Sequence, residues 1–96
     1  MKIRILREAE QDLLDGFLFY EQQEEGVGEY FLDSLFSDID SLYLYAGIHA
    51  VHFGFYRLLA RRFPFAVYYR VEEGDAFVYA VLDCRMNPSK TRDRLA

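Results

Sequence analysis

Residues 55–85 decide the fold, and they read FYRLLARRFPFAVYYRVEEGDAFVYAVLDCR. Three short runs within this stretch are rich in aromatic and β-branched residues, the composition that strands favour. They are Phe55–Arg61, Phe65–Val71 and Ala76–Arg85. Pro64 ends the first run because proline removes a backbone donor, and the polar link 72–75 contains a glycine suited to a hairpin turn. We therefore predict three consecutive antiparallel strands.

The N-terminal half shows a helical periodicity after one short strand. Lys2–Leu6 alternates polar and apolar residues, as a half-buried strand does. Two amphipathic helices follow, the first from Glu8 to about Glu25 and the second after Gly28, because apolar residues recur at spacings of three and four. Their apolar stripes are Ala9, Leu13, Phe17 and Tyr20, then Phe31, Leu32, Leu35, Phe36, Ile39 and Leu42. Glycines between them indicate a tight turn, and hence a helical hairpin.

Together these elements predict one α+β domain spanning residues 1–96, in the order β-α-α-β-β-β. The sheet is expected to be antiparallel, with the N-terminal helical hairpin packed on one face and the other face open. Residues 47–54 read as a loop or weak edge segment. Residues 86–96 contain Asn87-Pro88 and several basic residues, so they either begin a short helix or stay loose.

The net charge of −5 is unevenly distributed. Residues 1–45 carry eleven acidic and three basic residues, whereas residues 46–96 carry five acidic and eight basic ones. An acidic chain binds nucleic acid poorly, so direct nucleic-acid binding is not expected, and any polyanion contact would be local to the second half. The sequence shows neither the apolar stretch of a signal peptide nor a membrane-spanning run, which predicts a cytoplasmic protein without a membrane partner.

The chain resembles the RelE/ParE superfamily of type II toxin–antitoxin toxins, and within it the ParE-like branch of plasmid stabilisation proteins. Residues 55–71 are similar to the central two strands of ParE-like toxins, and residues 78–88 to the last strand and the Asn-Pro that follows it. The helices carry further matches: Ala9, Asp12, Leu13, Tyr20 and Glu21 in the first, and Gly28, Phe31 and Leu32 in the second.

This resemblance implies a toxin that binds and inhibits DNA gyrase and is neutralised by a cognate antitoxin, in a heterotetramer or larger complex. It implies no enzyme activity and no cofactor. RNA-cleaving relatives similar to RelE carry basic residues on the sheet and a tyrosine near the C-terminus. Arg57 and Arg85 match two of those basic positions, but Leu59 and Ala66 occupy two others, and no tyrosine follows Arg85.

Two alternatives stay open at this point. One is a ribosome-dependent mRNA endonuclease, in which Arg57, Arg61 and Arg85 would be the catalytic cations that stabilise the phosphorane. The other is a non-toxic, degenerate member that acts only as a binding module. Growth arrest, mRNA cleavage and the DNA-damage response would separate these hypotheses.

The predicted partner-binding residues lie in the three-strand region, where side chains two apart share a face. They are Arg57, Arg61, Arg62, Tyr68, Arg70 and Arg85. The competing interpretation is a solvated surface with cross-strand ion pairs to Glu72, Glu73 or Asp83.

Other polar groups are expected to have structural roles. The helix acids, including Asp12 and Glu21, are predicted to lie on solvated faces, and Cys84 is predicted to be a buried, reduced thiol. His49 and His52 are three residues apart, but no third ligand has a sensible spacing, so no metal site is predicted.

Overall fold

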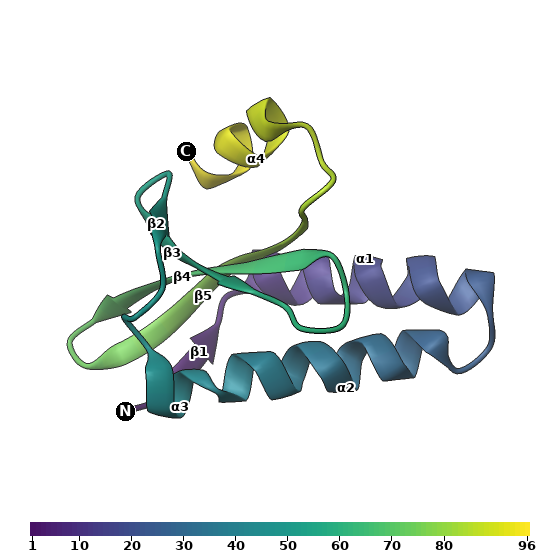
Figure 1. Cartoon of the computed structure of the whole chain (residues 1–96), viewed down its shortest axis with the longest axis horizontal. Coiled ribbons are helices and arrows are strands. Elements are labelled where there is room, and N and C mark those ends of the chain that lie inside the picture. Colours follow the sequence, from purple (N-terminus) through teal and green to yellow (C-terminus); the bar gives the residue numbers. More distant parts are fainter.

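A computed structural model describes all 96 residues and shows a sheet with helices on both sides (Figure 1). The predicted strands and the helical hairpin are confirmed, residues 47–54 contain a two-residue strand, and a separate short helix at Leu42–Tyr45 was not predicted. In chain order the elements are β1 (Ile3–Ile5), α1 (Arg7–Gln23), α2 (Val27–Asp40), α3 (Leu42–Tyr45), β2 (Val51–His52), β3 (Phe55–Leu59), β4 (Phe65–Glu72), β5 (Asp75–Asp83) and α4 (Pro88–Leu95). No helix has the length and apolar character needed to cross a bilayer.

The sheet has the order β1-β5-β4-β3-β2, and strands β2 to β5 form an antiparallel meander. β1 lies parallel to β5, with Ile3 opposite Ala76 and Ile5 opposite Val78. The prediction of a wholly antiparallel sheet is therefore wrong for β1. Periodicity indicates a strand but not its direction, which here is fixed by the return of the chain through α1 and α2 before the meander begins.

The two long helices cover one side of the sheet, which we call the hairpin face. Phe31 and Leu35 of α2 are fully buried there, against Val67 and Tyr69 of β4. Gly16 of α1 makes room for the Phe31 ring, because a Cβ at Gly16 would lie 2.4 Å from Phe31 Cζ. The amphipathic stripes read from the sequence thus form the main core.

The turn between α1 and α2 is fixed by a helix acid. Glu21 accepts hydrogen bonds from the backbone N–H groups of Gly26, at 3.0 Å to Oε2, and Gly28, at 2.9 Å to Oε1. Gly26 has φ of 91°, a conformation that favours glycine. Glu21 therefore satisfies the first N–H groups of α2, and it is half-buried in the turn instead of fully solvated as predicted.

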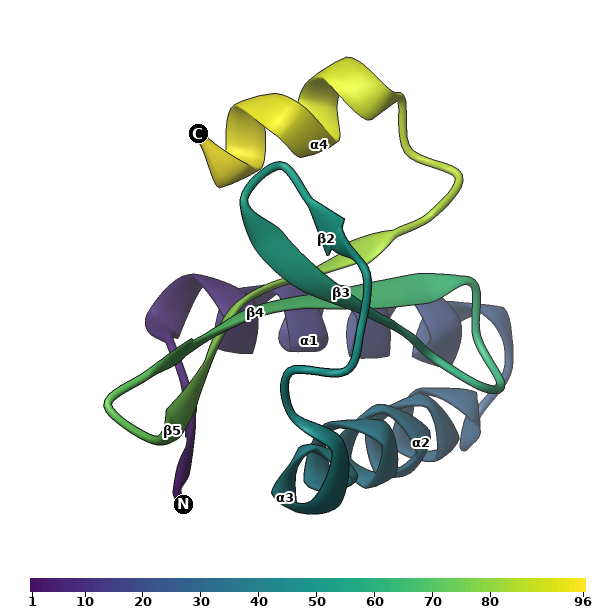
Figure 2. The same cartoon turned by 60° about the vertical axis from the view of Figure 1, so that its left-hand side comes forward.

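The opposite side of the sheet, which we call the α4 face, is not open as predicted. Helix α4 crosses it (Figure 2), and Leu95 is buried against it. The helix forms because Asn87 accepts a hydrogen bond from the Ser89 N–H at 2.9 Å, and Pro88 occupies the first turn. Of the two outcomes left open for residues 86–96, the short helix is correct.

Candidate functional site

The α4 face carries half of the predicted partner-binding residues. Alternation along β3 points Tyr56 and Leu58 into the hairpin core and leaves Phe55 and Arg57 on the α4 face. The same alternation along β4 places Tyr68 and Arg70 there, opposite Tyr69 in the main core. The residues that the structure brings onto this face are Arg57, Tyr68 and Arg70.

Arg57 and Tyr68 line a hollow of about 170 Å³ between the sheet and the start of α4, which we call the Arg57 hollow. Its other lining residues are His52, Phe53, Asp83, Cys84, Met86, Pro88 and Thr91. Tyr68 is only 6% exposed. Burial raises the pKa of Tyr68, and the neighbouring Arg57 side chain opposes that rise. Tyr68 therefore supports Arg57 and does not offer an open ring to a partner.

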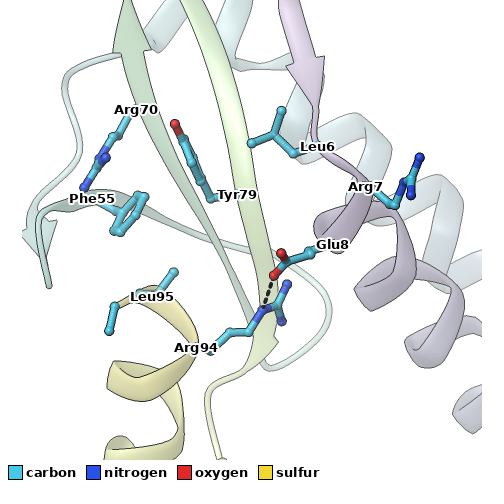
Figure 3. Close-up of a pocket in the computed structure, with 9 residues that line it drawn as sticks. Leu6, Arg7, Glu8, Phe55, Arg70, Tyr79, Arg94 and Leu95 are labelled. Carbon is cyan, nitrogen blue, oxygen red and sulfur yellow. Dashed lines mark hydrogen bonds and ion pairs between the residues drawn. The ribbon is translucent and has the colours of Figure 1, made fainter.

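A larger hollow of about 380 Å³ lies at the other end of α4, which we call the Arg70 hollow (Figure 3). The Arg70 guanidinium carbon is 4.0 Å from the centre of the Phe55 ring and 5.4 Å from that of Tyr79. Its Nε–H donates to the Gly54 carbonyl oxygen at 3.3 Å. Stacking and this hydrogen bond hold the guanidinium in one orientation.

A β-bulge brings Tyr79 into this hollow. Tyr68 pairs with Ala80 and Tyr69 pairs with Val78, so Tyr79 is the extra residue between them. Its ring meets that of Phe55 edge to face at 5.0 Å. The sequence offered no signal for the bulge, which places two successive residues, Tyr79 and Ala80, on the α4 face.

Helix α4 is fastened to α1 by an ion pair that crosses the end of the sheet. Arg94 donates two hydrogen bonds to Asp12, at 2.7 Å and 2.8 Å, and lies 3.3 Å from Glu8. Asp12 also accepts from the Val81 N–H at 2.9 Å. Burial raises the pKa of Asp12, while the Arg94 hydrogen bonds and the Val81 N–H oppose that rise. The prediction of a solvated Asp12 is therefore wrong.

The remaining predicted arginines lie elsewhere. β3 ends at Leu59, so the alternation that would orient Arg61 with Arg57 does not reach it, and the Arg61 N–H instead donates to Asp38 of α2 at 3.2 Å. Arg62 is exposed in the same loop. Arg85 pairs with Asp83 through two hydrogen bonds, at 2.9 Å and 2.7 Å, which lower the pKa of Asp83. Arg85 is therefore ion-paired as the competing interpretation held, but within one segment and not across two strands.

Neither histidine lies in a group that could hold a metal, because no three His, Cys, Asp or Glu side chains converge. His49 Nδ1 is hydrogen-bonded to the Tyr69 hydroxyl, whose oxygen also accepts from the Gly47 N–H at 2.9 Å. His52 lines the Arg57 hollow. Cys84 is exposed, so its predicted burial is wrong, because β5 ends one residue earlier at Asp83.

Comparison with known proteins identifies the fold. A chain of the structure described as "Chromosomal ParDE TA system from P. aeruginosa" matches with a TM-score of 0.75 and 19% sequence identity. The match covers 84% of this chain and 92% of that chain. No family model and no curated protein matches. The predicted ParE-like architecture is thus confirmed at the level of the fold.

Proposed function

We propose that this chain is the toxin component of a type II toxin–antitoxin system, of the ParE-like kind. The shared fold with a component of a ParDE system supports this, together with the ParE-like motifs of residues 55–71 and 78–88. The observation that carries the proposal is the division of the surface. Residues 7–45 hold eleven acidic residues and one basic residue, whereas the α4 face presents Arg57 and Arg70 without carboxylate partners.

The partner-binding residues in this proposal fall into two groups. Arg57, Tyr68 and Arg70 form the group on the α4 face, where the two arginines would contact the partner and the buried Tyr68 supports Arg57 from below. Arg61, Arg62 and Arg85 form a second group where the β3–β4 loop lies beside the end of β5, since the Cys84 N–H donates to the Pro64 carbonyl oxygen at 2.7 Å. A protein partner that spans both groups would extend along the strands, because Arg70 pairs with Phe77 near the β4–β5 turn and Arg85 lies beyond the other end of β5.

The target we propose is DNA gyrase, bound and inhibited rather than chemically modified. Catalysis by Arg57, Arg61 and Arg85 is disfavoured by their placement. Arg85 is neutralised by Asp83, and the Arg61 main chain is tied to α2, so the three do not surround one phosphate position. A binding role needs no such convergence.

A cognate antitoxin would neutralise the toxin by covering these residues. The chain offers it both charge signs, because the hairpin is acidic and the α4 face is basic. The exposed apolar side chains on the hairpin, such as Leu14 and Phe36, add surface that a partner would bury. We propose that the toxin and its antitoxin assemble as a heterotetramer or a larger complex, as the resemblance implies.

Induced expression tests the proposal. Wild-type chain alone should arrest growth, and co-expression of the adjacent gene should restore it. Transcripts should remain intact while a DNA-damage reporter rises, because gyrase inhibition leaves mRNA untouched. Cleaved transcripts with a silent reporter would instead support the endonuclease alternative. Normal growth at full expression would contradict the toxin proposal and favour a non-toxic binding module.

A further inference from the structure

We propose that the Arg70 hollow binds one carboxylate side chain of a protein partner, carried next to an apolar side chain. The proposal rests on the α4 face being a partner-binding face, and it adds the chemistry of the contact. The hollow brings together the start of α1, the three central strands and the end of α4, segments that are far apart in the sequence (Figure 3).

The first argument is that Arg70 is an oriented cation without a counter-charge. The ion pairs of the chain are formed by Arg4, Arg85 and Arg94, and none involves Arg70. Stacking on Phe55 and donation from Nε to Gly54 leave its two Nη groups without a hydrogen-bond acceptor in the chain. Because the guanidinium is already ordered, a ligand that binds it loses little side-chain entropy.

The second argument concerns the charge of the ligand. The charged side chains that line the hollow are those of three arginines and one glutamate, but Arg94 is already bound by Asp12 and Glu8. Arg7 points away from the hollow in Figure 3. Arg70 is thus the one uncompensated cation directed at the interior, and a single carboxylate matches it. A phosphate dianion would bring a second negative charge toward Glu8, which repels it.

The third argument concerns the stem that carries the carboxylate. Phe55, Tyr79, Leu6 and Leu95 supply the walls of the hollow. An apolar group beside the carboxylate would be removed from water against these side chains, which is favourable. The volume of about 380 Å³ admits one or two side chains but no whole helix. The site therefore fits an acidic residue flanked by an apolar one.

Small probes test this chemistry directly on the full chain. The probes are 3-phenylpropionate, its uncharged amide and phenyl phosphate, each titrated while backbone and arginine Nε–H signals are followed by NMR. The carboxylate should shift the signals of Phe55, Arg70, Tyr79 and Leu95 saturably, with about millimolar affinity for so small a ligand. The amide should bind at least about tenfold more weakly, since a charge-assisted hydrogen bond is lost.

A matched pair of variants completes the test. Arg70→Gln should weaken 3-phenylpropionate binding at least about tenfold. Arg92→Gln removes the same charge from the exposed side of α4, lines neither hollow, and should leave binding unchanged. Circular dichroism of both variants checks that each is folded.

Three results would overturn the proposal: no saturable shifts at the hollow, equal affinity for the amide, or tighter binding of phenyl phosphate than of the carboxylate. Equal effects of the two variants would also overturn it. None of these readouts depends on toxicity. Failure of growth arrest would contradict the proposed function alone, and failure of probe binding would contradict this site alone.

Discussion

The hairpin face of the sheet is sealed by one continuous core of twelve buried residues, whereas the α4 face has a core of six. Two long helices cover the first face, and one eight-residue helix crosses the second and leaves a hollow at each end. The two faces of one sheet therefore have different roles. The hairpin face supplies most of the stability, and the α4 face keeps cations oriented and accessible.

Removal of the Phe31 ring gives the largest expected effect. Phe31→Ala should destabilise the fold by about 3–5 kcal/mol, because the ring is fully buried over Gly16. The centre of the Phe31 ring lies 5.1 Å from that of Phe63 and 4.9 Å from that of Phe65. Urea unfolding measures the change. Leu14→Ala on the exposed side of α1 should cost about 0.5 kcal/mol. A similar loss of unfolding free energy in both variants would contradict the claim that the hairpin face supplies most of the stability.

Leu95→Ala tests the smaller core. It should lower the free energy of unfolding by about 2 kcal/mol at most, mainly because α4 detaches from the sheet. Hydrogen exchange should show faster exchange in Pro88–Leu95 while the amides of α2 stay protected. Uniform loss of protection across both faces would show that the two cores unfold as one unit, which would contradict the difference in stability between the two faces.

Asp12 joins the two faces, because it lies on α1 and binds Arg94 of α4. Asp12→Asn should cost about 1–2 kcal/mol by leaving Arg94 without its main counter-charge, and α4 should exchange faster. Asp15→Asn is the control, since Asp15 is exposed and bonds only Gln11 of its own helix. If Asp15→Asn destabilised the chain as much, general charge reduction on α1 would explain the effect.

A smaller effect is expected from pH, at the loop that joins α3 to the sheet. Burial lowers the pKa of His49 from its ordinary value of 6.5, so the folded chain disfavours the protonated ring more than the unfolded chain does. The contribution of His49 to stability should therefore be complete above that value and be lost as pH falls through and below it. His49→Gln should reduce this decline in thermal melts. If His49→Gln left the pH dependence of the melting temperature unchanged, protonation of His49 would not be the cause of the decline.

Local pattern was enough to predict the strands, the helical hairpin and their order, because each depends on periodicity within a few residues. The direction of β1, the coverage by α4 and the burial of Asp12 depend on contacts between distant segments. Arg94 and Asp12 are 82 residues apart, and nothing in the basic tail indicates its acidic partner. Residue type alone marked Arg57 and Arg70 as candidates, but it could not separate them from Arg85, whose charge is paired.

The most direct test of the account is growth arrest by two double variants that each remove two positive charges. Arg57→Gln with Arg70→Gln alters the α4 face, and Lys90→Gln with Arg92→Gln alters the outer side of α4. The first pair should raise survival after induction at least about tenfold while Tm changes by less than about 3 °C, and the second should remain as toxic as wild type. Full toxicity of the first pair, or equal loss in both, would contradict the assignment of recognition to the α4 face.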